Sequence, residues 1–424
     1  MKVWDLDKEY NELLAFVVEG REKNKKDIRT SVEDIKKELL QKSEEALTAF
    51  SKKWDGWTRN YPLKANEDEL KESASGVSKE DIEVLKGMID NVAHYHKNQG
   101  ARKRTYKRKG VVVHETPEPV ERVLVYVPGG KATYPSSLIM GTVPAQIAGV
   151  DRIYATTPTF DGRLDPYVSA AALLLGMKEI YRIGGAQAVY AFAYGIGSIP
   201  KVDMIVGPGN AYVDEAKRDV YGMVGIDMLA GPTELIVLCT EAFSPDAVAW
   251  DLFSQAEHDA MATVGIFSPS KGHIEDILKS IDRLMVVNER KDIIEKALKG
   301  NSFFVHYQDV SKAVRAVNTI APEHMELLGE ESIASHIRYP GIVYLGPHTP
   351  VAMGDYYIGT NHVLPTGGAG RFVGGLSVDR FTRRKITVKL EKDFLDKYSD
   401  KAIRLSKIEG LFAHGESIKA RKEL

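Results

Sequence analysis

Four segments of the sequence contain residue types that acid–base catalysis or metal binding requires. Gln255 and His258 are three residues apart in a segment with helical spacing, so their side chains face the same way and can share one ion. Glu323 and His324 are adjacent and offer two general bases, of which the imidazole titrates near neutral pH. From spacing alone, a solvated helix end explains the first pair better, and the second pair is common by chance.

The densest polar stretch runs from residue 353 to residue 371 and contains Asp355 and His362 among Gly, Thr and Asn residues. A long loop of this composition inside a compact protein is usually functional or disordered, and the Asp and His favour function. Near the end of the sequence, Glu409 and His414 add another carboxylate and imidazole before a short basic helix. A charged surface is the alternative interpretation of these last two residues.

Three expected strands end in glycine clusters, at Gly129-Gly130, Gly184-Gly185 and Gly207-Pro208-Gly209. Ligands of parallel sheets bind beyond the carboxyl ends of the strands, where glycine lets backbone amides approach phosphates. None of the clusters fits Gly-x-Gly-x-x-Gly followed by an acidic residue about 20 positions later. A phosphate-bearing ligand and plain tight turns therefore remain equally good explanations of the glycines.

The elements that must position these residues follow an α/β rhythm. From Val123 onward, short β-branched runs alternate with helical patterns about every 25 to 30 residues, which is typical of βαβ units and predicts a parallel sheet buried on both faces. A second α/β unit is expected after Cys239, with helices over about 245–260 and 310–317. The expected strands are 123–127, 153–156, 180–183, 204–206 and 235–238 before Cys239, and 264–267, 303–305 and 342–345 after it.

The two ends of the sequence differ from the central part in composition and in the spacing of apolar residues. The first 100 residues are rich in Lys and Glu and place apolar residues at helical spacing, which predicts surface helices. The basic run 101–110 is followed by Val111-Val112-Val113, and a solvated hairpin explains it better than a nucleic-acid site. From about residue 377 the sequence is highly charged and is predicted to be a separate helical tail.

The composition excludes several classes of protein. A length of 424 residues predicts two to three domains. The net charge of −2, from 57 Lys and Arg against 59 Asp and Glu, argues against nucleic acid as the main partner. No apolar run approaches the ~20 residues that a membrane-spanning helix needs. The single cysteine, Cys239, favours the reducing cytoplasm and leaves His, carboxylate and amide groups as the ligands for any metal.

Taken together and in order, these segments closely resemble the histidinol dehydrogenase family. The resemblance is carried by the glycine clusters and by Ser254-Gln255-Ala256-Glu257-His258, Ala321-Pro322-Glu323-His324, Gly354-Asp355-Tyr356, Thr360-Asn361-His362-Val363-Leu364-Pro365-Thr366 and Glu409-Gly410-Leu411 with His414. It covers about residue 120 to the end and, more loosely, the first third. It implies two Rossmann-like, doubly wound parallel-sheet domains with small helical N- and C-terminal elements, in an intertwined homodimer.

The resemblance also implies how the sequence is divided into domains. The implied divisions are an N-terminal helical element, 1–24; a first α/β domain with the metal and catalytic residues, 25–125 together with 239–376; a Rossmann-like NAD-binding domain, 126–238; and a C-terminal dimer-exchange element, 377–424. In the first third, Ser43-Glu44-Glu45-Ala46-Leu47 stands where the family more usually has Gly-Asp-x-Ala-Leu, which weakens the boundaries there.

The activity implied by the resemblance is the zinc- and NAD-dependent oxidation of L-histidinol, through L-histidinal, to L-histidine, which is the last reaction of histidine biosynthesis. His324 would take the hydroxyl proton, and Glu323 would activate the water that hydrates the aldehyde. The matching zinc ligands are Gln255, His258, Asp355 and His414. The matching substrate contacts are Thr233, Gln255, His258, His324, Asp355, His362, Glu409 and His414, and the matching NAD contacts are Tyr126, Gln187 and Asn210.

Two details of the resemblance bear on substrate and assembly. Thr233 stands where many relatives have a serine, so the hydroxyl is kept and a methyl is added. Glu409 and His414 are expected to act across the dimer interface. The alternatives are a dehydrogenase on the same scaffold for another small alcohol, such as a sulfonated diol, and a non-catalytic nucleotide- or RNA-binding protein that uses the 101–110 run. A carboxylate at position 409 favours an imidazole N–H over a sulfonate.

Overall fold

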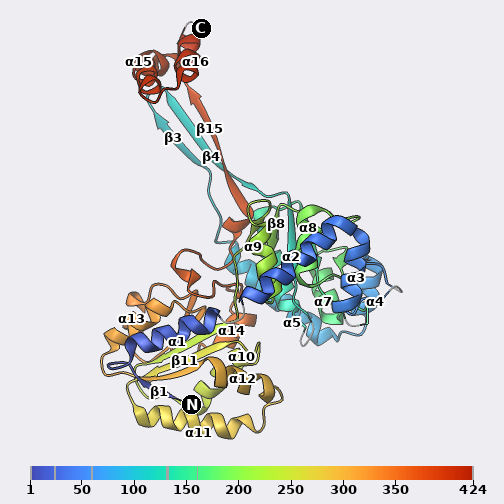
Figure 1. The fold of residues 1–424 in the computed structure, drawn as a ribbon, viewed down its shortest axis with the longest axis vertical. Coiled ribbons are helices and arrows are strands. Elements are labelled where there is room, and N and C mark those ends of the chain that lie inside the picture. The colour runs from blue at the N-terminus through green and yellow to red at the C-terminus, as the bar shows by residue number, and fades with distance from the viewer. Residues whose placement is uncertain (1, 23–24, 59–60, 130–132, 160, 423–424) are drawn as a thin grey trace. The chain divides into compact units, whose positions relative to one another are not determined.

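The protein forms two compact units, which are described separately (Figure 1). The first unit comprises Met1–Gln99 and Val120–Phe381, and the second comprises Gly100–Pro119 and Thr382–Leu424. The computed structural model describes residues 2–22, 25–58, 61–129, 133–159 and 161–422. None of the helices in these ranges is both long enough and apolar enough to cross a membrane.

The first sheet of the larger unit has six strands, all paired in parallel. Its order is β1 (Val3–Asp5), β12 (Ser302–His306), β11 (Thr263–Ser268), β10 (Glu234–Cys239), β13 (His324–Leu328) and β14 (Ile342–Leu345). Successive residues of β10 point to opposite faces, so Leu235 and Val237 join one core and Ile236 and Leu238 join the other. The covering helices are α10 (Pro245–Ala256), α11 (Lys271–Met285) and α12 (Lys291–Asn301) on the first face, and α1 (Tyr10–Glu22) and α13 (Val310–Ile320) on the second.

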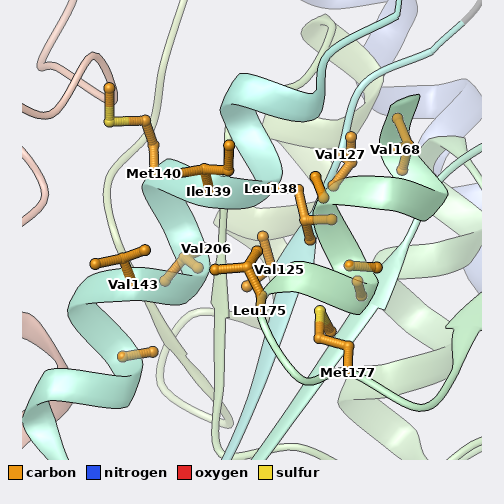
Figure 2. Packing of buried hydrophobic residues seen from close by; sticks show 14 of the residues in the cluster. Val125, Val127, Leu138, Ile139, Met140, Val143, Val168, Leu175, Met177 and Val206 are labelled. Carbon is orange, nitrogen blue, oxygen red and sulfur yellow. The ribbon is translucent and has the colours of Figure 1, made fainter. Parts of the chain in front are cut away.

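The second sheet of the larger unit also has six strands, of which only β2 is antiparallel to its neighbour. Its order is β2 (Lys64–Ala65), β7 (Ile180–Tyr181), β6 (Arg152–Thr156), β5 (Arg122–Tyr126), β8 (Met204–Val206) and β9 (Gly225–Ile226). On one face Val125 and Val206 lie in the same core as Leu138 and Val143 of α6 (Figure 2). The helices that cover this face are α4 (Glu67–Ala74), α5 (Lys79–His96), α6 (Pro135–Ala148) and α7 (Pro166–Leu174). The helices that cover the opposite face are α2 (Lys25–Lys42), α3 (Glu44–Trp54), α8 (Gly185–Tyr194) and α9 (Ala211–Val220).

The smaller unit is a three-stranded antiparallel sheet followed by two helices that pack together. Its elements are β3 (Arg104–Arg108), β4 (Val111–Pro119), β15 (Thr382–Leu390), α15 (Lys392–Ile408) and α16 (Phe412–Lys422). The predicted hairpin is confirmed by β3 and β4. The prediction of a helical tail from residue 377 is wrong over β15, where Ile386, Val388 and Leu390 alternate with polar residues in the period of a strand.

The two parallel sheets confirm the predicted fold class. The strand pairing differs, however, from the predicted grouping of residues. β10 was expected beside the strands before it but pairs with β11 and β13, while β2 and β5, both within 25–125, belong to the second sheet. The N-terminal segment 1–24 also contributes a strand, β1, to the first sheet. The physical reason is that an apolar run reports burial and does not identify the neighbouring strand.

Short elements complete the part of the larger unit that holds the polar stretch at 353–371. Asp355 lies in the short helix α14 (Val351–Tyr356), which begins after Pro350. Three single turns of 3-10 helix accompany it: η1 (Glu331–His336), η2 (Ala369–Arg371) and η3 (Val378–Phe381). The stretch contacts a helix of the second sheet, since Asn361 donates to the carbonyl of Met140 in α6.

Candidate active site

The adjacent acid and base lie at the amino end of β13 and are almost completely buried. Glu323 is 7% exposed and His324 is 3% exposed. Helix α13 ends at Ala321, whose φ of 49° is left-handed, and Pro322 prevents the helix from continuing. The next residues enter the sheet, where β13 pairs with β10, and this turn brings Glu323 Oε2 to 3.4 Å from His324 Nδ1.

Burial and ion pairing act in opposite directions on this pair. Burial alone would raise the pKa of Glu323, but the His324 ring, the Thr233 hydroxyl and the Glu234 backbone N–H together bring that pKa below its usual value. Burial alone would lower the pKa of His324, yet the Glu323 carboxylate raises it to about 9. With no cation present, the ring is therefore held protonated; a metal ion bound beside it would favour the neutral form, which is the form that can accept a proton.

Thr233 connects the acid–base pair to Gln255. Its Oγ1 lies 2.6 Å from Glu323 Oε2 and 2.8 Å from Gln255 Oε1, and its single hydrogen goes to the carboxylate, which can only accept. Gln255 Nε2 is buried and has no hydrogen-bond partner within the described ranges. Turning the amide over would let it donate to Thr233 and would free its oxygen, which is the atom that a cation binds.

Asp355 and His362 lie on the other side of the His324 ring. His324 Nε2 has no hydrogen-bond partner among the described residues, and it lies 3.9 Å from Asp355 Oδ1. His362 Nδ1 lies 3.1 Å from the backbone oxygen of Asp355. Burial is the main cause that lowers the pKa of His362, so its ring is neutral at pH 7 and can bind a ligand as a donor or an acceptor.

His258 is exposed just beyond the end of α10 and opens onto a cavity of about 320 Å³. The cavity is lined by side chains from segments that flank each of the two sheets of the larger unit, including Tyr356, the neighbour of Asp355. The lining residues are Val84, Leu85, Met88, Thr133, Tyr134, Pro135, Ser136, Tyr167, Glu257, His258, Arg290, Tyr356 and Tyr357. Of the predicted metal ligands, His258 is therefore accessible to a small molecule in this cavity.

The last two predicted site residues belong to the smaller unit. Glu409 follows α15 and His414 lies in α16. The larger unit alone therefore contains three of the four predicted zinc ligands. Across the part of the chain that the structure describes, no three His, Cys, Asp or Glu side chains are grouped closely enough to hold a metal ion.

The predicted NAD contacts all lie at the carboxyl ends of strands in the second sheet or directly after them. The Tyr126 hydroxyl accepts a hydrogen bond from the Gly185 backbone N–H at 3.0 Å. Gln187 Nε2 donates to both carboxylate oxygens of Asp55, at 3.2 and 3.0 Å. Asn210 Oδ1 accepts from two backbone N–H groups at the start of α9. Tyr126 thus holds the backbone of a glycine turn, and each of the three side chains keeps one further polar group for a ligand.

Sequence reasoning missed an ion pair behind the catalytic residues. Arg21 of α1 donates two hydrogen bonds to the Glu234 carboxylate, at 2.7 and 2.9 Å. The backbone of Glu234 donates to Glu323, and its carbonyl lies 3.2 Å from His324 Nδ1. A charged residue at the start of an apolar strand was a usable signal for Glu234, whereas nothing in the local sequence marks Arg21.

A pair of carboxyl groups, the buried Glu326 and the half-buried Asp251, was also missed. Glu326 lies two residues after His324 on the same face of β13, and Asp251 lies one helical turn before Gln255. Burial, followed by the charge of Asp251, raises the pKa of Glu326 well above its usual value. Glu326 accepts from the Val351 backbone N–H at 2.7 Å and so supports the helix that contains Asp355.

This arrangement defines a class of protein. A glycine-lined edge suited to a dinucleotide belongs to one sheet, a buried carboxylate–imidazole pair belongs to the other, and both sheets are part of one compact unit. These are the parts of a two-sheet α/β dehydrogenase.

Comparison with known proteins narrows the class to one family. The sequence profile described as histidinol dehydrogenase matches residues 18–422. Histidinol dehydrogenase from Caldanaerobacter subterraneus subsp. tengcongensis is 40% identical over 425 residues, which is 99% of each chain. The enzyme of the same name from Methanocaldococcus jannaschii is 38% identical over 425 residues, with 99% of this chain and 98% of the other covered. The crystal structure of histidinol dehydrogenase from Elizabethkingia anophelis superimposes with a TM-score of 0.91 at 31% identity, covering 100% of this chain and 97% of that one.

The chain belongs to the histidinol dehydrogenase family, as the sequence motifs predicted. It is therefore an enzyme, an oxidoreductase of histidine biosynthesis. The individual residue roles, the metal, the cofactor contacts and the assembly remain predictions.

Proposed function

We propose that this enzyme oxidises L-histidinol to L-histidine in two successive steps that each reduce one NAD. The observation that carries the proposal is the buried Glu323–His324 pair, joined through Thr233 to Gln255 and flanked by Asp355. One residue of the pair has an unpartnered ring nitrogen for an alcohol proton, and the other is a carboxylate suited to activating water.

Zinc fits the residues predicted to hold it. Gln255, His258, Asp355 and His414 offer amide oxygen, imidazole nitrogen and carboxylate, which is a ligand set that suits zinc without thiolate. The unpartnered amide nitrogen of Gln255 supports this fit, because turning the amide over frees its oxygen for a cation. When bound, the ion would anchor the amine and imidazole of the substrate and so fix the orientation of the reacting carbon.

In the first oxidation, His324 takes the proton of the substrate hydroxyl at Nε2 while a hydride leaves the same carbon for NAD. Asp355 and His362 lie beside that nitrogen and line the space that the substrate would fill. The product is the aldehyde, with one NADH and one proton for each histidinol. Burial of the pair at 3% and 7% exposure keeps bulk water away from the proton transfer.

The second oxidation requires an added oxygen, because the aldehyde carbon has a single hydrogen left. Glu323 accepts a proton from water as the water adds to the aldehyde, and the carbonyl oxygen takes the proton that His324 gained in the first step, which gives the hydrated diol and a neutral His324. The diol then loses its hydride to a second NAD, and the carboxylic acid forms with a second NADH and a proton. Thr233 and the Glu234 backbone N–H donate to Glu323 and hold its carboxylate in a single orientation.

The dinucleotide would lie along the glycine turns of the second sheet. Tyr126, Gln187 and Asn210 there keep a hydroxyl hydrogen, an amide oxygen and an amide nitrogen that their protein hydrogen bonds do not use. The positive dipole ends at the starts of α8 and α9 favour the negative charge of a pyrophosphate.

A homodimer would complete the active site. The sheet of the smaller unit has one apolar face, on which Tyr106, Val113 and Val388 lie in register and Tyr106 and Val388 are more than half exposed. The segments of this unit carry 18 Lys and Arg against 9 Asp and Glu, although the whole chain has a net charge of −2. An apolar face on a basic unit fits the acidic remainder of a second copy, which would bring Glu409 to the substrate imidazole and His414 to the metal.

The cytoplasmic location stays a prediction that rests on the single, buried Cys239. The proposed reaction is tested by counting the NADH formed from limiting L-histidinol beside a panel of small alcohols, including a sulfonated diol. Two NADH for each histidinol and little turnover of the other alcohols are expected. One NADH for each histidinol, or faster oxidation of the diol, would contradict the proposal. Oligonucleotide binding that needs the 101–110 basic residues, without NADH formation, would favour a nucleic-acid-binding protein instead.

A further inference from the structure

A buried lysine and a buried aspartate lie directly behind the third glycine turn. Lys217 of α9 and Asp227, which follows β9, have fully buried side chains, and Lys217 Nζ lies 2.5 Å from Asp227 Oδ1. Removing two charges from water costs several kcal/mol for each ion, so a buried ion pair is rarely worth keeping for stability alone. The contacts of this pair show what else it does.

Both charged groups hold the backbone of Gly207. The Gly207 N–H donates to Asp227 Oδ2 at 2.7 Å, and its carbonyl accepts from Lys217 Nζ at 3.0 Å. Gly207 has a φ of 112°, and a Cβ there would lie 2.1 Å from the backbone oxygen of Tyr126. The turn that leads to Asn210 is therefore fixed from behind at both polar groups of its first residue.

The same cluster reaches the segment that crosses to the first sheet. Asp214 of α9 faces Lys217 and Asp227, and the backbone N–H of Ala230 faces its carboxyl group. Burial raises the pKa of Asp214 to about 7, and its Oδ1 has no hydrogen-bond partner within the described residues. Residues 227–233 lead from β9 to β10, so Ala230 is three residues before Thr233, whose hydroxyl holds Glu323.

We infer that Lys217, Asp227 and Asp214 are positioning residues that hold the cofactor turn after β8 and the Ala230–Thr233 segment in one fixed register. Through this cluster, the turn that would hold the dinucleotide and the segment that orients the acid–base pair share a single support. The distance between the hydride acceptor and the reacting carbon then depends on the cluster, although none of its members touches either ligand. This inference rests on the proposed function, because it assigns the turn to NAD.

The main test is the double variant Lys217→Met/Asp227→Asn, which removes both charges together and leaves no unpaired buried charge. We expect the KM for NAD to rise about tenfold or more, the Kd of NAD measured directly by fluorescence to rise in parallel, and the KM for histidinol to change less than about twofold. Misaligned hydride transfer should also increase the deuterium isotope effect of histidinol labelled at the reacting carbon. The matched control is Lys36→Met. It removes a partly exposed ion pair between Lys36 of α2 and Asp219 of α9, the helix that also contains Lys217, and should leave all four values unchanged.

The outcomes separate this inference from a purely structural role. A double variant with a lower melting temperature but unchanged NAD affinity and isotope effect would overturn it. If the double variant does not fold, Asp214→Asn removes a single carboxyl group and is expected to raise the KM for NAD about threefold and to increase the isotope effect; unchanged values there would also overturn the inference. If the wild-type enzyme forms no NADH from histidinol, the proposed function fails, and the direct NAD-binding comparison still decides whether the cluster supports the turn.

Discussion

The two sheets of the larger unit carry their candidate functional residues at opposite ends of their strands, and each such end is called an edge below. The acid–base pair, Thr233 and Glu234 lie at the amino ends of β10 and β13 in the first sheet, whereas the glycine turns lie at the carboxyl ends of β5, β7 and β8 in the second. At the first edge, side chains keep unpartnered atoms, namely Gln255 Nε2 and His324 Nε2. At the second edge, Tyr126, Asp227 and Lys217 use their polar atoms on glycine backbones.

This difference indicates that the reaction and the binding of the cofactor are assigned to different edges. Side chains with free polar atoms can ligate, protonate and deprotonate, so the first edge is suited to the reaction itself. Side chains that hold a backbone fix the shape of a turn, so the second edge is suited to binding a cofactor through main-chain groups. Changes at the first edge should therefore lower kcat, and changes at the second should raise the KM for NAD.

The largest effect is expected from removing the metal, because the proposed metal site adjoins the first edge and not the glycine turns of the second. Treatment with a chelator should lower turnover about a thousandfold, because the substrate loses its anchor while the turns of the second sheet are untouched. The measurement is NADH formation before and after chelation, with the Kd of NAD as the internal control. Added zinc should restore turnover. Full activity after chelation, or an equal loss of NAD binding, would contradict the division.

Glu323→Gln should slow oxidation of the aldehyde about a hundredfold and oxidation of the alcohol much less, since only the aldehyde step needs activated water. Separate assays with histidinol and histidinal measure the two steps. Glu331→Gln, at an exposed carboxylate of η1, is the matched control and should leave both rates unchanged. Equal slowing of both steps would remove the water-activating role of Glu323.

At the second edge, Asp55 makes stability depend on pH. Burial raises its pKa to about 6, so between pH 4 and 6 the folded protein binds the proton more tightly than the unfolded chain does. The stability that this proton contributes is present below pH 4 and is lost as the pH rises through 6. At 1.36 kcal/mol for each tenfold change in proton affinity, the loss is about 3 kcal/mol. The free energy of unfolding of wild type relative to Asp55→Asn should fall by about that amount from pH 4 to pH 7, whereas the exposed Asp34→Asn should show no such trend. A constant difference would show that Asp55 is not titrating.

The smallest effect is expected from Tyr126→Phe, which removes the acceptor of the Gly185 N–H. The loss of one hydrogen bond costs about 1 kcal/mol, so the KM for NAD should rise about fivefold with kcat little changed. Steady-state kinetics with varied NAD measure this effect. Tyr154→Phe, in the core on the same face of the second sheet, is the control and should leave the KM unchanged. A large drop in kcat with an unchanged KM for NAD would contradict the assignment of cofactor binding to the second edge.

Much of the fold was predictable because buried strands and amphipathic helices leave strong local patterns. The strands around Val125, Ile205 and Ile266 and the helix before His258 fall where the sequence predicts them. The partner of each strand was not predictable, since β10 has the same apolar pattern as the strands of the sheet to which it does not belong. The strand that begins at His324 was not among the predicted strands.

The candidate site was predictable only through its motifs. From spacing alone, a solvated helix end explained Gln255 and His258 better, and the order of several motifs was needed to group them with Glu323 and Asp355. The supporting shell was not predictable, because Arg21 and Glu234 meet across 213 residues of sequence and carry no local signal of the pairing. Long-range ion pairs of this kind depend on tertiary packing, which periodicity does not encode.

The strand β1 has a consequence for how the protein is made. Its only partner in the first sheet is β12, and the register joins Val3 to Phe304. A ribosome that adds about 5 to 20 residues each second needs roughly 15 to 60 s to reach that partner. This strand therefore emerges long before its partner, and during this delay Trp4 and Leu6, both buried in the finished core, are available to chaperones.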